Sequence, residues 1–205
     1  MKLLHIYLLL ALLGGISVVN AEKTVYGPGD YTNQTFTEPL TIMGPLTATG
    51  LKAPKIVVHG PARLNDSMVG TLTVMGPLKA DKTTFEGPVS VTGAVTTKDS
   101  TFKGLLEISG KDLAITLEDT HTKNVLVTLQ KSGVTTTDGQ SSFSFSFSTK
   151  KKPSGTTIHL KDNSVIDGSL TVAQGEASLI KDDNARITGT IYGVKTLSEK
   201  EQEKS

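Results

Sequence analysis

Three aspartates recur at regular intervals in the first half of the chain. Asp66, Asp81 and Asp99 each stand five or six positions after a glycine, so a chain coiled with that period would carry them along one edge. Glycoside hydrolysis requires two carboxyl groups about 5 to 10 Å apart beside a sugar-binding cleft. Lys82 and Lys98 adjoin these aspartates, which is also typical of a solvated turn. We therefore treat the three as candidate glycan-facing residues and assign no catalytic residue.

Few other side chains offer catalytic or metal-binding chemistry. The chain has no cysteine and no tryptophan, and His59, His121 and His159 are not spaced like metal ligands. The Asx-rich stretches 161–168 and 181–189 lack the spacing of a calcium loop and are typical of turns that bond their own backbone. We expect no metal, no other cofactor and no enzymatic activity.

The first 21 residues predict an export signal. They contain an apolar run over 3–13 and a small residue at Ala21, and the polar residues that follow leave the run too short to span a bilayer. Cleavage after Ala21 removes one of the 21 basic residues and leaves 20 against 20 acidic ones. Such neutrality argues against a nucleic-acid partner. We expect a periplasmic or secreted protein with no transmembrane segment after signal removal.

The elements that must position these residues follow from a short repeat of about 16 or 17 residues. Two series of glycines recur with this period, and within each series the interval varies by no more than one position. The first series is Gly44, Gly60, Gly76, Gly93 and Gly110, and the second is Gly70, Gly87 and Gly104. A fixed short period predicts stacked structural units, none of which can bury its apolar face alone.

Aliphatic residues occupy the positions four and two before each glycine of the first series. These ten are Leu40, Ile42, Ile56, Val58, Leu72, Val74, Val89, Val91, Leu106 and Ile108. Four of the five residues between them are polar, and this alternation predicts strands buried on one face. A shorter alternating strand follows each glycine, and Ala53, Val69, Phe85 and Phe102 form a third apolar column.

The predicted fold class is therefore all-β, a single-stranded parallel β-helix with about three strand-like sides per turn. A β-sandwich with regular turns is the alternative. After Gly110 the register is lost, although alternation persists at 112–117, 124–130 and 141–148, so we expect irregular strands or an insertion there. The predicted organisation is a signal peptide (1–21), a lead-in or cap (22–37), a regular β-helix (38–110), an irregular part (111–155), a continuation (156–195) and a polar tail (196–205).

The glycine-punctuated turns GTLTVMG (70–76) and VIDGSLTV (165–172) resemble those of the bactofilins and related short-rung β-helix proteins. The resemblance covers residues 38–110 and 160–193. It implies a compact, three-sided, right-handed β-helix that polymerises end to end without nucleotide. Bactofilins are typically cytoplasmic, whereas this chain carries an export signal.

The functional expectation is an exported, non-enzymatic structural or interaction protein of the bacterial envelope. Its partner is a second copy, met end to end, or another component of the envelope or the extracellular space. The alternative is a β-helix that binds or degrades polysaccharide through the row Asp66, Asp81 and Asp99.

Overall fold

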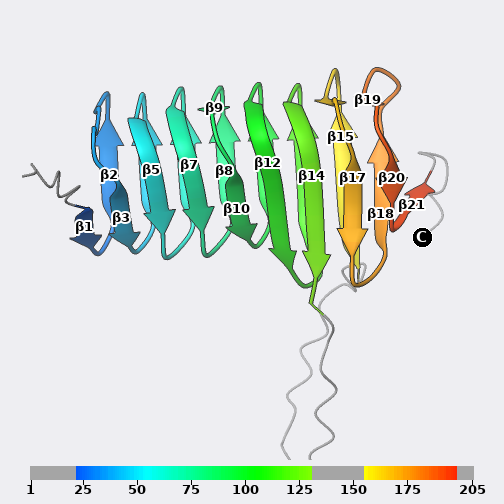
Figure 1. Ribbon diagram of the computed structural model, residues 1–205, viewed down its shortest axis with the longest axis horizontal. Coiled ribbons are helices and arrows are strands. Elements are labelled where there is room, and N and C mark those ends of the chain that lie inside the picture. Colours follow the sequence, from blue (N-terminus) through cyan, green and yellow to red (C-terminus); the bar gives the residue numbers. More distant parts are fainter. Residues whose placement is uncertain (1–21, 131–154, 198–205) are drawn as a thin grey trace, which may run out of the picture.

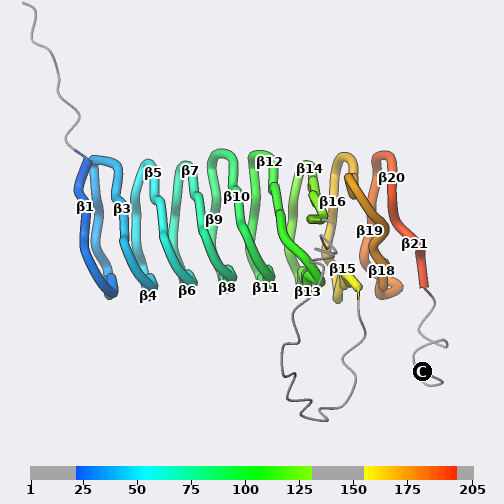
Figure 2. The backbone as a smooth tube through the Cα atoms, turned by 90° about the horizontal axis from the view of Figure 1, so that it is seen from below, coloured from blue at the N-terminus to red at the C-terminus, as the bar shows by residue number. Residues whose placement is uncertain are grey.

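The computed structural model describes residues 22–130 and 155–197. The chain there winds into an elongated stack of turns, with β1 and β21 at opposite ends (Figures 1 and 2). Every strand pairing among these residues is parallel, so the predicted fold class, a parallel β-solenoid, is confirmed. The predicted signal peptide, the Phe–Ser stretch at 141–148 and the tail from residue 198 lie outside the described residues.

Hydrogen bonding between turns forms two sheets. Sheet A contains β1 (Lys23–Tyr26), β3 (Leu40–Met43), β5 (Lys52–Val58), β7 (Met68–Val74), β9 (Thr84–Phe85), β10 (Val89–Thr92), β12 (Thr101–Gly110), β14 (His121–Leu129), β16 (Val165–Ile166), β17 (Leu170–Ala173), β19 (Arg186–Ile187) and β20 (Ile191–Tyr192). Sheet B contains β2 (Gly29–Thr32), β4 (Leu46–Thr49), β6 (Ala62–Asn65), β8 (Leu78–Asp81), β11 (Val95–Lys98), β13 (Ala114–Glu118), β15 (Thr156–Lys161), β18 (Ala177–Lys181) and β21 (Val194–Leu197). Sheet B has nine strands, one for each turn of the solenoid in the described part of the chain.

The third strand-like side of each turn is not a separate sheet. In β5, β7, β12 and β14 the backbone stays in strand geometry through the corner that joins this short side to the rest of sheet A. In other turns the strand breaks there, as between β9 and β10 across Gly87 and Pro88. Proline lacks the N–H that the ladder needs, and Pro88 stands in this break, but proline alone does not end a strand here because β5 continues through Pro54.

The ten aliphatic residues form two columns, one on each side of the polar column. Within each column the residues of successive turns lie directly over one another. Leu72 pairs with Ile56 on one side and Val89 on the other, in register. All ten are at most 1% exposed. The third column is buried as well, and the rings of Phe85 and Phe102 stack with centroids 4.5 Å apart. These columns fill the hollow between the sheets, so the core runs the length of the molecule.

The stack continues past Gly110, where the glycine register ends. Leu106 pairs with Val125 across a longer interval of sequence than Leu72 and Val89, because this turn is longer than the earlier ones. Val125 then pairs with Leu170, and the undescribed residues 131–154 stand between them in the chain. When residues 131–154 are left out, the interval from Val125 to Leu170 equals the interval from Leu170 to its partner Ile191 in the last turn. Residues 113–130 are thus part of the solenoid, and the insertion lies between β14 and β15.

Candidate functional site

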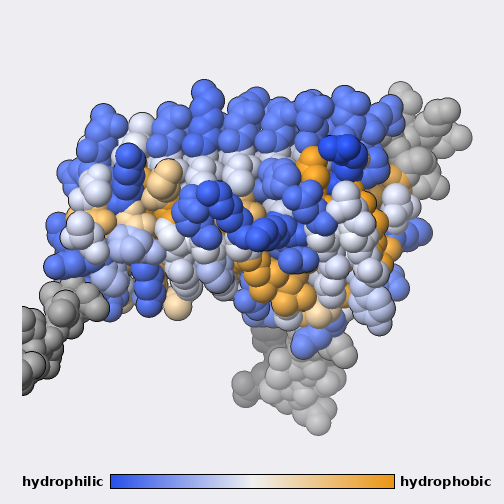
Figure 3. Space-filling view, turned by 45° about the horizontal axis from the view of Figure 1, so that its top comes forward, coloured by the Kyte–Doolittle hydropathy of each residue, from blue (hydrophilic) through white to orange (hydrophobic). Residues whose placement is uncertain are grey.

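A hydrophilic corner follows the strands of sheet B and forms a row along the upper edge in Figure 3. In successive turns its residues read Asn65-Asp66-Ser67, Asp81-Lys82-Thr83, Lys98-Asp99-Ser100, Glu118-Asp119-Thr120 and, with one residue more, Lys161-Asp162-Asn163-Ser164. The row collects many of the charged side chains of the molecule, including all three candidate glycan-facing aspartates. This corner is therefore the candidate site.

The second residue of each of these corners has a left-handed backbone. The φ angles are 46° at Asp66, 48° at Lys82, 45° at Asp99, 45° at Asp119 and 52° at Asp162. Among residues with a β-carbon, Asp and Asn are the ones that most readily adopt this conformation, because their short polar side chains bond locally. Backbone geometry therefore explains Asp66, Asp99 and Asp119 without a ligand.

The last residue of each corner is a serine or threonine with a buried hydroxyl that closes the turn. Ser67, Thr83, Ser100, Thr120 and Ser164 each donate to a carbonyl two or three positions earlier, at 2.7 to 2.9 Å. Ser67, Ser100 and Ser164 also accept a backbone N–H from the preceding turn, at 3.1 to 3.2 Å. The three serine hydroxyls, and Thr120 through its bond to Thr97, join neighbouring turns where the strand ladder is interrupted, so they stabilise the stack.

The candidate glycan-facing aspartates do not form one column. Asp66 and Asp99 are exposed and occupy the same position as Lys82. Asp81 ends β8 and pairs in register with Asn65 and Lys98, one position earlier. Its Oδ1 is buried and has no hydrogen-bond partner within residues 22–130 and 155–197. The structure thus brings the three to one edge but gives them two different environments.

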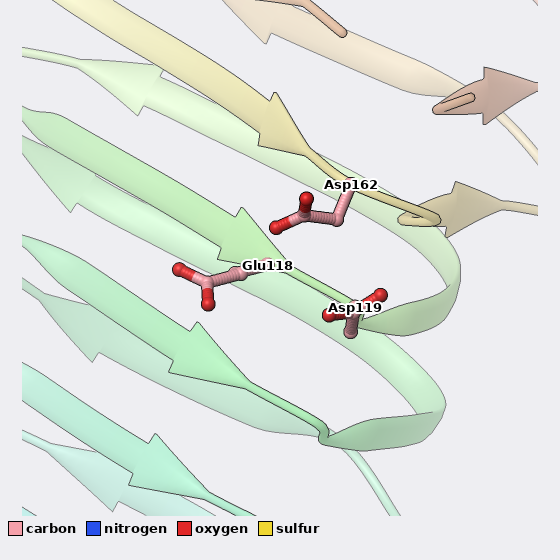
Figure 4. Close-up of side chains that lie close together, drawn as sticks. All are labelled: Glu118, Asp119 and Asp162. Carbon is pink, nitrogen blue, oxygen red and sulfur yellow. The ribbon is translucent and has the colours of Figure 1, made fainter. Parts of the chain in front are cut away.

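Three other carboxylates come closer together. Glu118, Asp119 and Asp162 come from adjacent turns, and one oxygen of each lies within 4.8 Å of the others (Figure 4). Carboxylate oxygens so placed are suitable ligands for a hard cation. Glu118 already accepts a hydrogen bond from Lys98 Nζ at 2.6 Å, which raises the pKa of Lys98, and Asp119 accepts two from Asn163. These partners account for Glu118 and Asp119, and the left-handed backbone of Asp162 accounts for the third carboxylate as a corner residue.

Two histidines pair with aspartates across turns near the C-terminal end. His121 Nε2 lies 2.5 Å from Asp167 Oδ2, and His159 Nε2 lies 3.3 Å from Asp182 Oδ1. A hydrogen bond from the Asp162 N–H to Asp182, assisted by His159, holds the pKa of Asp182 below its usual range. Both pairs join consecutive turns, so they act between layers of the stack rather than facing a cavity.

The N-terminal end of the solenoid is partly closed by its own side chains. Lys23 occupies the column position of Leu40 in the first turn, and its Nζ lies 4.9 Å from the centroid of the Phe36 ring. The Tyr31 and Phe36 rings meet edge to face, with centroids 5.2 Å apart. Both aromatic side chains are half-buried and pack on the core. A cationic and aromatic layer therefore covers this end.

The C-terminal end leaves core positions open. Ile191 continues the column of Leu170, which is 0% exposed, yet Ile191 is 44% exposed. Ile187 and Val194 continue the columns of Ile166 and Ala177 and are only half-buried. β19, β20 and β21 each have a strand neighbour on one side only among the described residues. This end therefore presents apolar side chains together with the edge of each sheet.

Sequence reasoning placed a cap at 22–37 but missed the acidic cluster and the side chains that form the cap. The turn containing Glu118 and the turn containing Asp162 are separated by the insertion, so no fixed period relates these residues in the sequence. Lys23 and Phe36 precede the first recognised repeat, although Phe36 stands one period before Ala53 and its N–H bonds the carbonyl of Lys52. The corner motifs that end in Ser or Thr recur in the sequence and could have revealed the hydrophilic corner.

No protein-family model matches this chain, and comparisons with curated proteins and with solved structures give no significant match. Fold and site therefore define the class, a parallel β-solenoid with an insertion after its seventh sheet-A layer. Within the described residues, no helix is both long and apolar enough to cross a bilayer.

Proposed function

We propose that the protein is an exported, non-enzymatic structural or interaction module of the bacterial envelope that associates with its own copies through the ends of the solenoid. The observation that carries the proposal is the open core column at the last turn, where Ile191 is 44% exposed. Apolar side chains and strand edges so placed favour association with another β-structure. A second copy stacked on this end would complete the core of the last turn.

The first turn and the final strands of the solenoid carry net charges of opposite sign. The first turn (22–37) carries two acidic residues and one basic residue, and the final strands β19 to β21 with their connections (186–197) carry two basic residues and no acidic one, although Asp182 and Asp183 precede them. Phe36 begins the column that Ile187 ends, so stacking a second copy head to tail would place one over the other. Opposite charge favours encounter of these two surfaces over encounter of like ends.

The test is sedimentation of the mature chain over a range of concentrations. We expect a mass that rises with concentration and a loss of that rise in Ile191→Lys, because the lysine places a charge on the open column. Tyr192→Lys is the matched control, since Tyr192 is on the same strand, points outward and is 69% exposed. Thermal unfolding of each variant checks that the monomer remains folded.

A mass that stays monomeric at every concentration would contradict the proposal. So would equal loss of association in the two lysine variants. The polysaccharide alternative through Asp66, Asp81 and Asp99 remains a prediction. The left-handed turns explain two of these residues, and no contact within the described residues favours a sugar at this edge.

A further inference from the structure

The opposite edge of the solenoid carries a second repeated feature. The turns that lead from sheet A to sheet B, along the lower edge in Figure 1, contain Gly-Pro in each of the first four layers. They read YGPGD (26–30), MGPLT (43–47), HGPAR (59–63) and MGPLK (75–79). The next layer builds the same corner with TGAVT (92–96). The fold therefore does not require proline at this corner, although proline is a favoured turn residue.

A groove runs beside these prolines. It has a volume of about 350 Å³ and crosses four layers along the solenoid axis. One side is formed by Pro45, Pro61 and Pro77, which stack in consecutive turns. The other side is formed by the outward column of sheet B, which is Thr47, Arg63, Lys79 and Thr96. The groove thus has an apolar side and a side of cations and hydroxyls.

The two cations lie directly opposite each other. Arg63 and Lys79 are register partners on neighbouring strands, about 4.8 Å apart along the stack. Both are exposed, and neither makes an ion pair within residues 22–130 and 155–197, although Asp81 stands two positions beyond Lys79 on the same face. Like charges directly opposed across strands are unfavourable, and an anion between them would remove the repulsion.

The backbone around the groove is already paired. Leu46, Ala62 and Leu78 each donate their N–H to a carbonyl of the next turn, at 2.9 Å. A peptide added as a β-strand would find these donors already taken. A ligand must therefore be recognised by side chains. The prolines can pack against apolar faces of the ligand, and Thr47 and Thr96 can bond its hydroxyls. The two cations can bind its anionic groups.

We propose that this groove binds a linear anionic polysaccharide laid along the solenoid axis. Sugar rings offer C–H faces for Pro45, Pro61 and Pro77, hydroxyls for the two threonines, and carboxylates or sulfates for Arg63 and Lys79. This site is separate from the open end and does not depend on self-association. It also differs in position and charge from the aspartate edge, because its charged side chains are the cations Arg63 and Lys79.

The experiment measures binding of the mature protein to polygalacturonate and to dextran sulfate, with uncharged dextran as the matched polymer. We expect binding to at least one charged polymer and none to dextran. The double variant Arg63→Gln/Lys79→Gln should bind about tenfold more weakly or worse, since two charge-assisted contacts are lost. Lys55→Gln/Lys123→Gln makes the same change in net charge at exposed lysines of sheet A and should leave affinity within about twofold.

Four outcomes would overturn the proposal. The first is that neither charged polymer binds, and the second is that dextran binds as well as dextran sulfate. The third is that the control double variant loses as much affinity as the groove variant, which would indicate only long-range attraction. The fourth is that polyglutamate or monomeric galacturonate binds as tightly as the polymers, which would indicate an unspecific anion site. The mass measurements described above are unaffected by all four, so the two proposals can fail separately.

Discussion

At the scale of single residues, the corner glycines differ in the room that their neighbours leave. A β-carbon on Gly70 would lie 2.0 Å from the carbonyl oxygen of Pro54 in the turn before. On Gly87, one turn later in the same series, the nearest atom would be the carbonyl oxygen of Gly70 at 3.0 Å. Backbone atoms of a hydrogen-bonded turn cannot move aside as a side chain can. Gly70 is therefore required by close approach and Gly87 much less so.

Replacing Gly70 by alanine should destabilise the protein by about 3 kcal/mol, because the turn must shift to admit the methyl group. Gly87→Ala is the matched control and should cost about 1 kcal/mol or less. Urea unfolding followed by far-UV circular dichroism measures both. Equal losses in the two variants would show that the spacing between turns is more adaptable than the structure indicates.

At the scale of elements, the columns of side chains that run through successive strands differ in whether their buried hydroxyls are hydrogen-bonded. The third column passes from the stacked rings of Phe85 and Phe102 to Thr122 and then to Ile166. Thr122 is 0% exposed, and its Oγ1 has no hydrogen-bond partner among the residues described. Thr120, two positions earlier, is also buried, but its Oγ1 bonds the carbonyl of Glu118 and the hydroxyl of Thr97.

These two threonines should respond oppositely to the same substitution. Thr122→Val replaces an unpaired hydroxyl by a methyl group of similar volume, and we expect it to stabilise the protein by about 1 kcal/mol. Thr120→Val removes two hydrogen bonds and leaves the groups that shared them without a partner, at a cost of about 2 kcal/mol. Thermal unfolding of both variants compares them. A destabilised Thr122→Val would mean that its hydroxyl has a partner after all.

At the scale of the whole molecule, the ends differ from the middle because each end strand has a neighbour on one side only among the described residues. Lys23, Tyr31 and Phe36 cover much of the first turn, whereas Ile187 and Ile191 leave the last one open. The stability of a solenoid is the sum of its turns and the interfaces between them. The terminal turns are thus expected to open more readily than the central ones.

Hydrogen exchange should report both properties. In dilute protein, amides of β20 and β21 should exchange faster than those of β7 and β10, which are paired on both sides. At high concentration, β21 and β1 should both gain protection if copies stack head to tail. Protection gained by β21 alone would indicate that two C-terminal ends meet instead, and this would contradict the head-to-tail arrangement.

The glycine period and the alternation of apolar residues were enough to determine a parallel solenoid, its turn length and the residues over one another in its core. These features could be predicted because each turn meets only its neighbours, so spatial contacts appear in the sequence as a constant spacing. The corner aspartates could be located for the same reason, but not interpreted, since a shift of one position separates Asp81 from Asp66 and Asp99.

Three features were decided only by the tertiary structure. Past Gly110 the turns lengthen and the insertion intervenes, so the contacts of Glu118 with Asp162 and of His121 with Asp167 follow no period. Which end of the solenoid exposes its core depends on how individual side chains cover that end, as the Lys23 side chain covers the Phe36 ring. The period alone aligns the prolines and the cations of separate repeats, but whether a groove remains between these two columns depends on how their side chains pack.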